Sequence, residues 1–151
     1  MTRRENMLDK SLIGRESDPV VHDVEKNAIR RFAEAVGDPN PIYVDEAAAK
    51  AAGYAGLVAP PTFPVTLAAN DRFRHSLDLG TRSVLHREQA FEYARPVVAG
   101  DRITVRSRVA DVQELSGASG PMDVLVVEDE GRDGEGKLVF KTRAMLILRR
   151  A

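Results

Sequence analysis

The C-terminal half of the chain alternates between apolar and polar side chains, and this limits the folds open to it. Over residues 102–109, Ile103, Val105, Ser107 and Val109 alternate with charged or polar neighbours, and residues 138–149 repeat the pattern. A period of two indicates strands of a sheet with one solvated face. Glycine-containing turns separate these runs. From about residue 83 onward, the sequence therefore predicts consecutive long antiparallel strands.

The first part of the chain predicts a short strand and then a helix. The segment Pro-Val-Val-His-Asp at residues 19–23 suits the start of a short strand. Apolar residues at helical spacing then predict a helix over 24–36, with Asp23 as its N-cap. Gly37 follows directly, where a left-handed residue commonly ends a helix.

Two further helices are predicted before the strands begin. Asp45 suits the N-cap of an alanine-rich helix over 46–52. Thr62 suits the N-cap of a helix over about 63–72, which is apolar on most sides and therefore buried. Helices followed by long strands indicate an α+β fold in which an antiparallel sheet wraps around a central helix. Because such a sheet has open edges, we expect a dimer.

Composition excludes several classes of function. The length of 151 residues predicts one domain over 1–151. The net charge of −1 creates no long-range field that would attract nucleic acid or an anionic membrane. Residues 1–10 are expected to be a loosely ordered arm, held down by Leu12 and Ile13. No signal peptide or membrane-spanning run is recognised, and the absence of cysteine fits a cytoplasmic protein. The three histidines are too scattered to predict a metal site.

The stretch 37–63 carries the candidate site. Asp38, Asn40 and Tyr43 stand among glycine and prolines, in a loop whose backbone is nearly fixed. Such a loop can aim polar side chains at a ligand. The alternative for Asp38 and Asn40 is that they bond to their own loop. The alternative for Tyr43 is a packed ring with a solvated hydroxyl.

Several segments resemble one known family. The runs Phe-Ala-Glu-Ala-Val-Gly-Asp-Pro-Asn-Pro-Ile-Tyr at 32–43 and Gly-Tyr-Ala-Gly-Leu-Val-Ala-Pro-Pro-Thr-Phe at 53–63 resemble MaoC-like (R)-specific enoyl-thioester hydratases and dehydratases. The segments 86–91 and 95–101 are similar too. The likeness is to the N-terminal-type domain of actinobacterial fatty-acid dehydratase subunits, and it spans about residues 10–149. It implies a hot-dog fold.

The resemblance also implies a chemistry, from which this chain departs at two places. In the family, an Asp and a His of the loop add or remove water across an acyl-CoA or acyl-carrier-protein thioester, without a cofactor. Asp38 and Asn40 match the family pattern, but Tyr43 stands where the His is expected. Tyrosine has an ordinary pKa near 10 and is a poor base. Pro61 replaces a residue whose N–H would bind the thioester oxygen, although the amide of Thr62 remains available.

Three hypotheses follow. In the first, the chain is a subunit that shapes the acyl site while a related hot-dog partner performs the chemistry. In the second, it is a self-sufficient homodimeric hydratase that uses Asp38 with Tyr43 or His86. In the third, it is an acyl-thioester binder without turnover. His86 and Gln89 lie in a predicted strand. They either reach a site shared with a partner chain or are ordinary strand residues.

Overall fold

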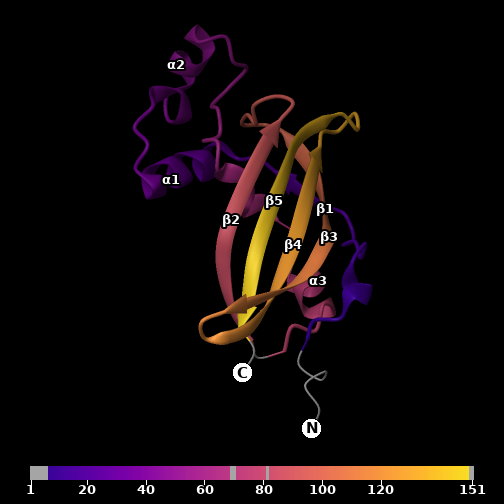
Figure 1. The fold of residues 1–151 in the computed structure, drawn as a ribbon. Helices are drawn as coiled ribbons and strands as arrows, with labels where there is room; N and C mark the ends of the chain where they lie inside the picture. The colour runs from indigo at the N-terminus through magenta and orange to yellow at the C-terminus, as the bar shows by residue number, and fades with distance from the viewer. Residues whose placement is uncertain (1–6, 69–70, 81, 150–151) are drawn as a thin grey trace.

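A single five-stranded antiparallel sheet dominates the structure, a computed structural model that describes residues 7–68, 71–80 and 82–149. The strands are β1 (Val20–Asp23), β2 (Ser83–Tyr93), β3 (Arg102–Gly117), β4 (Gly120–Arg132) and β5 (Leu138–Arg149). Their order across the sheet is β1-β3-β4-β5-β2. Figure 1 shows a small helix, α3 (Asp71–Ser76), behind the lower part of the sheet. The predicted α+β fold is therefore confirmed, and the long strands begin at residue 83 as expected.

The helix predicted over 24–36 is present as α1 (Lys26–Val36) and ends as expected. Gly37 adopts a left-handed φ of 70°, and the amides of Gly37 and Asp38 donate to the carbonyls of Glu34 and Ala33. The predicted N-cap is wrong. Asp23 belongs to β1 and pairs there with Arg102, so the N-cap position falls to Glu25, whose side chain makes no capping bond.

The alanine-rich helix is also present, as α2 (Glu46–Ala51). The carboxylate of Asp45 accepts a 2.9 Å hydrogen bond from the amide of Ala47, as an N-cap does. A short 3-10 turn, η2 (Pro41–Tyr43), joins α1 to α2. In Figure 1, α1 and α2 lie together at the upper left, on the β2 side of the sheet.

The prediction of one helix over 63–72 is wrong. The chain forms a 3-10 helix, η3 (Phe63–Leu67), and then α3; of the predicted range, 69–70 fall outside the described residues. Thr62 makes no side-chain capping bond. Ala68 ends η3 in an extended conformation, with ψ of 168°, which a continuous helix cannot accommodate. The buried apolar character predicted for this segment does appear, since Phe63 and Leu67 are 3% and 5% exposed.

Two hydrophobic clusters fill the sheet's inner face, which is the face toward η3 and α3. The upper cluster joins α1, the 37–63 segment and η3 to the sheet, and the lower one joins α3 and the N-terminal segment to it. Between them lies a polar row, in which the hydroxyls of Ser107 and Thr142 donate to Asp129 over 2.5 and 3.2 Å. Burial raises the pKa of Asp129 despite these bonds.

The N-terminal segment packs on the lower cluster. Leu8 and Leu12 are buried, the latter in a 3-10 turn, η1 (Lys10–Leu12). Leu12 thus holds the segment down as expected, whereas Ile13 is 42% exposed. The first six residues of the predicted arm lie outside the described part of the chain.

The two sheet edges differ in length. β1 is a four-residue edge strand, but β2 is an eleven-residue edge strand whose side chains are mostly exposed. A long exposed edge offers unpaired backbone groups to another chain. None of the described helices is long and apolar enough to cross a membrane.

Candidate functional site

The polar side chains of the 37–43 loop hold the loop itself. The carboxylate of Asp38 accepts a 3.1 Å hydrogen bond from the amide of Asn40, and the Asn40 side chain accepts one of 3.2 Å from Ile42. Each is a local turn of the kind that Asp and Asn form with backbone two residues ahead. Asp38 remains half-buried and Asn40 exposed. One oxygen of each side chain is therefore engaged in keeping the loop rigid.

Tyr43 is a core ring. It is 6% exposed and belongs to the upper cluster. Burial raises the pKa of its hydroxyl, and the nearby charges of Asp38 and Tyr54 raise it further. Asp38 and Tyr43 thus lie close enough to interact, as the sequence suggested, but the shift makes Tyr43 a weaker base than free tyrosine. Tyr54 was not predicted as a site residue, although it stands in a segment that carried the resemblance.

The start of η3 is attached to the sheet by a residue that the sequence did not single out. The hydroxyl of Tyr93, at the end of β2, donates to the carbonyl of Pro61 over 2.5 Å. Burial raises the pKa of Tyr93 to about 12, so it is a hydrogen-bond donor at neutral pH. Pro61 and Thr62 are exposed beside this contact, and the amide of Thr62 donates to no group among the described residues. An edge contact of 5.5 Å between Phe32 and Phe63 joins α1 to the same point.

His86 and Gln89 lie farther down β2. Both share the inner face with Tyr93, because a bulge between His86 and Glu88 shifts the alternation by one residue. At about 3.3 Å per strand residue, Gln89 is roughly 13 Å and His86 roughly 23 Å from Tyr93 along the strand. Within one chain, His86 therefore does not meet Pro61 or Thr62. It is exposed on an edge strand, where a partner chain could bring another loop to it.

A second histidine is partly buried. His22 of β1 is bonded to the backbone of Ala68, just after η3, and burial lowers the pKa of its ring. Its Nε2 atom is buried and has no hydrogen-bond partner in the part of the chain that the structure describes. No pattern in the sequence predicts this contact, because the position of Ala68 depends on where η3 ends. No group of three or more metal-ligating side chains occurs among the described residues.

The chemistry available at the 37–63 segment is thus limited. It holds a carboxylate, Asp38, a tyrosine with a raised pKa, Tyr43, and a free amide at Thr62. A general base needs a pKa near the working pH. The titratable side chains that raise the pKa of Tyr43 are Asp38 and Tyr54, and neither is a histidine.

Comparison with known proteins agrees with this picture of the fold. The model of the family described as FAS1-like, dehydratase domain region, matches residues 11–142. A "UPF0336 protein" of Streptomyces avermitilis is 43% identical over 149 residues, which cover 95% of this chain and 97% of the relative.

Solved structures of dehydratases are similar as well. A chain of the truncated HadBC complex of Mycobacterium tuberculosis, titled a 3R-hydroxyacyl-ACP dehydratase, superimposes with a TM-score of 0.78 and 31% identity, over 90% of this chain and 96% of that one. A "MaoC-like dehydratase" gives a TM-score of 0.83 and 29% identity over 93% of this chain, but 43% of that longer chain. These matches confirm the MaoC-like resemblance and the hot-dog fold.

Proposed function

Since the chain belongs to the family of FAS1-like dehydratase domain regions, we propose that it is a subunit of an (R)-3-hydroxyacyl-thioester dehydratase or enoyl-thioester hydratase. In this proposal it shapes the acyl site, and a related hot-dog partner supplies the acid–base chemistry. Its substrate is an acyl-CoA or acyl-carrier-protein thioester of fatty-acid or related acyl metabolism in the cytoplasm.

The observation that carries the proposal is the state of Tyr43. Dehydration removes a proton from Cα and the hydroxyl from Cβ, leaving a double bond conjugated to the thioester and releasing water. The proton needs a base that is unprotonated near neutral pH. Tyr43 occupies the position where the family resemblance places a histidine, and burial and Asp38 both raise its pKa. The Tyr43 hydroxyl therefore keeps its proton at neutral pH, and the Tyr43 ring packs in the upper cluster.

The remaining parts of the segment are suited to positioning. Asp38 and Asn40 fix the loop, and the bond from Tyr93 to Pro61 fixes the start of η3 against the sheet. A rigid frame is what an acyl site requires, because misplacement of about 1 Å can cost roughly 10²-fold in rate. The amide of Thr62 is the donor in this frame that remains open to a ligand oxygen.

The partner in this proposal binds along β2. The strand offers eleven residues of unpaired edge, and adding a strand there satisfies backbone groups that water otherwise hydrates. Such pairing places His86 and Gln89 at the junction of the two chains. The dehydratase of known structure at 31% identity is itself titled a complex, HadBC.

Turnover assays test this division of labour. The purified chain is offered crotonyl-CoA and longer trans-2-enoyl thioesters, and loss of the enoyl absorbance is followed. We expect no turnover by the chain alone, and turnover after addition of a hot-dog subunit, encoded beside it, that retains Asp and His in its loop. Turnover by the isolated chain that Asp38→Asn abolishes would show instead a self-sufficient hydratase. Thermal stabilisation by acyl-CoA, with no turnover in either condition, would show a binding protein.

A further inference from the structure

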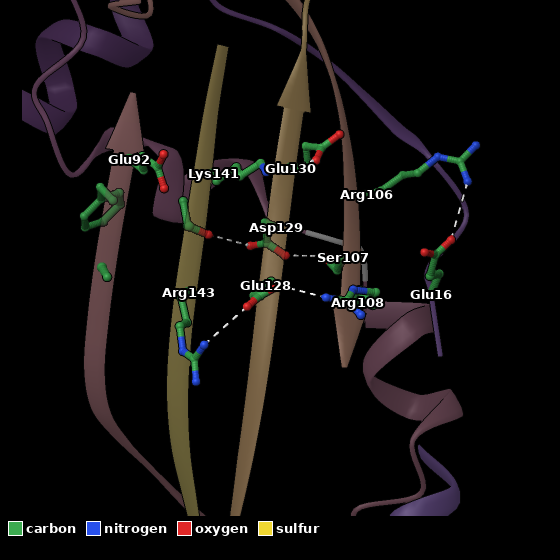
Figure 2. A pocket seen from close by; sticks show the side chains of 13 residues that line it. Glu16, Glu92, Arg106, Ser107, Arg108, Glu128, Asp129, Glu130, Lys141 and Arg143 are labelled. Atoms are coloured by element: carbon green, nitrogen blue, oxygen red, sulfur yellow. Dashed lines mark hydrogen bonds and ion pairs between the residues drawn. The ribbon is translucent and has the colours of Figure 1, made fainter. Parts of the chain in front are cut away.

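The outer face of the sheet, which points away from η3 and α3, carries two rows of charge that alternate in sign. The strand register places the members of each row at one level across four strands, and the two rows lie two residues apart along each strand. From β2 to β3, the first row is Glu92, Lys141, Glu130 and Arg106, and the second is Ala90, Arg143, Glu128 and Arg108. A shallow hollow of about 760 Å³ lies between the rows. Figure 2 shows these side chains flanking it.

Within one chain these charges already form ion pairs. Glu128 lies between Arg108 and Arg143, at 3.0 and 3.4 Å, and Glu130 lies 3.9 Å from Lys141. The side chains are a third to a half exposed, so the pairs contribute little to stability. Because the signs alternate and nearly cancel, the face offers no field to a polyanion. A complementary partner surface must also alternate in sign, with the opposite charge at each facing position.

The same face is apolar nearer the β3–β4 hairpin. Of the outward positions at the centre of the sheet there, Met145 and Ile147 are partly exposed, whereas Val124 and Val126 are buried among their neighbours at 3% and 0% exposed. On the flanking strands, Leu85 and Leu115 are 47% and 36% exposed. The outer face of β2–β5 is thus divided along the strands into a charged half and an apolar half.

We propose that this outer face binds the same face of a second copy of the chain, about a two-fold axis that runs parallel to the strands between β4 and β5. Such an axis exchanges β4 with β5 and β3 with β2, and it keeps each level of the sheet opposite itself. Lys141 then faces Glu130 of the partner copy, and Glu92 faces Arg106. In the second row, Arg143 faces Glu128.

The apolar half obeys the same symmetry. The partly exposed Ile147 and Met145 then lie over the positions of Val124 and Val126 of the partner copy, which are already buried within their own chain. A two-fold axis across the strands would instead place the charged half against the apolar half, which desolvates charges without a partner. Among facing positions of the described strands, Glu88 and Asp111 form one like-charged pair, on the flanking strands away from the axis. Sheets packed face to face with nearly aligned strands are a common arrangement, about 10 Å apart.

This interface leaves the β2 edge and the 37–63 segment free. It therefore goes beyond the proposed function and does not depend on it. Two edge-paired dimers joined through their outer faces make a tetramer.

Charge exchange between separate chains provides the test. Lys141→Glu alone and Glu130→Lys alone each place like charges opposite one another in a self-pair. Mixing the two variants restores opposite charges across the axis, while the pair inside each chain stays repulsive. Recovery on mixing therefore reports contacts between chains. The mass is measured by sedimentation equilibrium on the full chain at low salt.

We expect the wild-type mass to fall by half in each variant and to return on 1:1 mixing. The matched controls are Lys137→Glu and Glu135→Lys, an ion pair 74% exposed on each side, in the β4–β5 turn. These carry the same charge changes and are expected to leave the mass unchanged. A circular dichroism spectrum verifies that each variant is folded. A wild-type monomer, a mass insensitive to both outer-face variants, or no recovery on mixing would overturn the proposal.

Discussion

Tyr43 is the residue at which a structural and a catalytic role predict opposite results. Its ring is 6% exposed in the upper cluster, and no hydrogen bond joins its hydroxyl to another group among the described residues. Removing the hydroxyl in Tyr43→Phe should therefore cost less than about 1 kcal/mol. Removing the ring in Tyr43→Ala should cost about 3–5 kcal/mol, the usual range for a buried aromatic side chain.

These energies convert into melting temperatures. For a domain of this size, 1 kcal/mol shifts the melting temperature by about 2–4 °C. We expect Tyr43→Ala to melt roughly 6–20 °C below the wild type, and Tyr43→Phe less than about 4 °C below it. Thermal unfolding followed by circular dichroism measures both shifts under the same conditions.

Turnover of the assembled dehydratase completes the test. With its partner present, Tyr43→Phe should retain turnover within a few-fold of the wild type. A proton-transferring residue normally contributes about 10²–10⁴-fold, so a loss of that size with an unchanged melting temperature would refute the structural role of Tyr43. Equal destabilisation by Phe and Ala would refute the packing argument.

Three further predictions concern the sheet and the loop that joins β2 to β3. Gly131→Ala places a Cβ 2.5 Å from the fully buried ring of Phe140, so we expect about 1–3 kcal/mol of destabilisation in urea; an unchanged midpoint would contradict the contact. Asp101→Ala removes an ion pair in which Arg95 donates two hydrogen bonds to Asp101, of 2.8 and 3.1 Å. We expect the free energy of unfolding to fall by about 1.5–3 kcal/mol in the same urea assay. A loss below about 0.5 kcal/mol, which is typical of an exposed pair, would contradict this. Burial raises the pKa of Asp129 above its unfolded value of 3.8, so its ionisation opposes folding as the pH rises through the raised pKa. Melting curves should show Asp129→Asn gaining stability relative to the wild type between pH 4 and pH 7, and a difference independent of pH would contradict this.

The regular elements could be predicted because their signals are local. Alternation in 102–109 and 138–149 gave the strands, and Gly37 gave the end of α1. The interruption after Leu67 could not be predicted, because the composition of 63–72 is that of a buried helix. The extended Ala68 arises from packing of η3 and α3 on different parts of the sheet.

The candidate site was predictable in outline only. Asp38, Asn40 and Tyr43 stand in one short motif, and the structure does place Asp38 near Tyr43. The role of Tyr93 depends on contact with Pro61, 32 positions earlier in the chain. A tyrosine at a strand end gives no sign of such a partner. The same holds for the outer-face charges, whose sign pattern emerges only once the register of four strands is known.

The central claim is that this chain frames an acyl site whose proton transfers belong to a partner. The most direct measurement is enoyl-CoA hydration by the assembled pair when Asp38→Asn is placed in this chain alone. We predict that turnover stays within a few-fold of the wild-type pair, because Asp38 acts in this chain through its bond to the Asn40 amide. A fall of about 10²-fold or more, with assembly intact, would place the chemistry on this chain and contradict the claim.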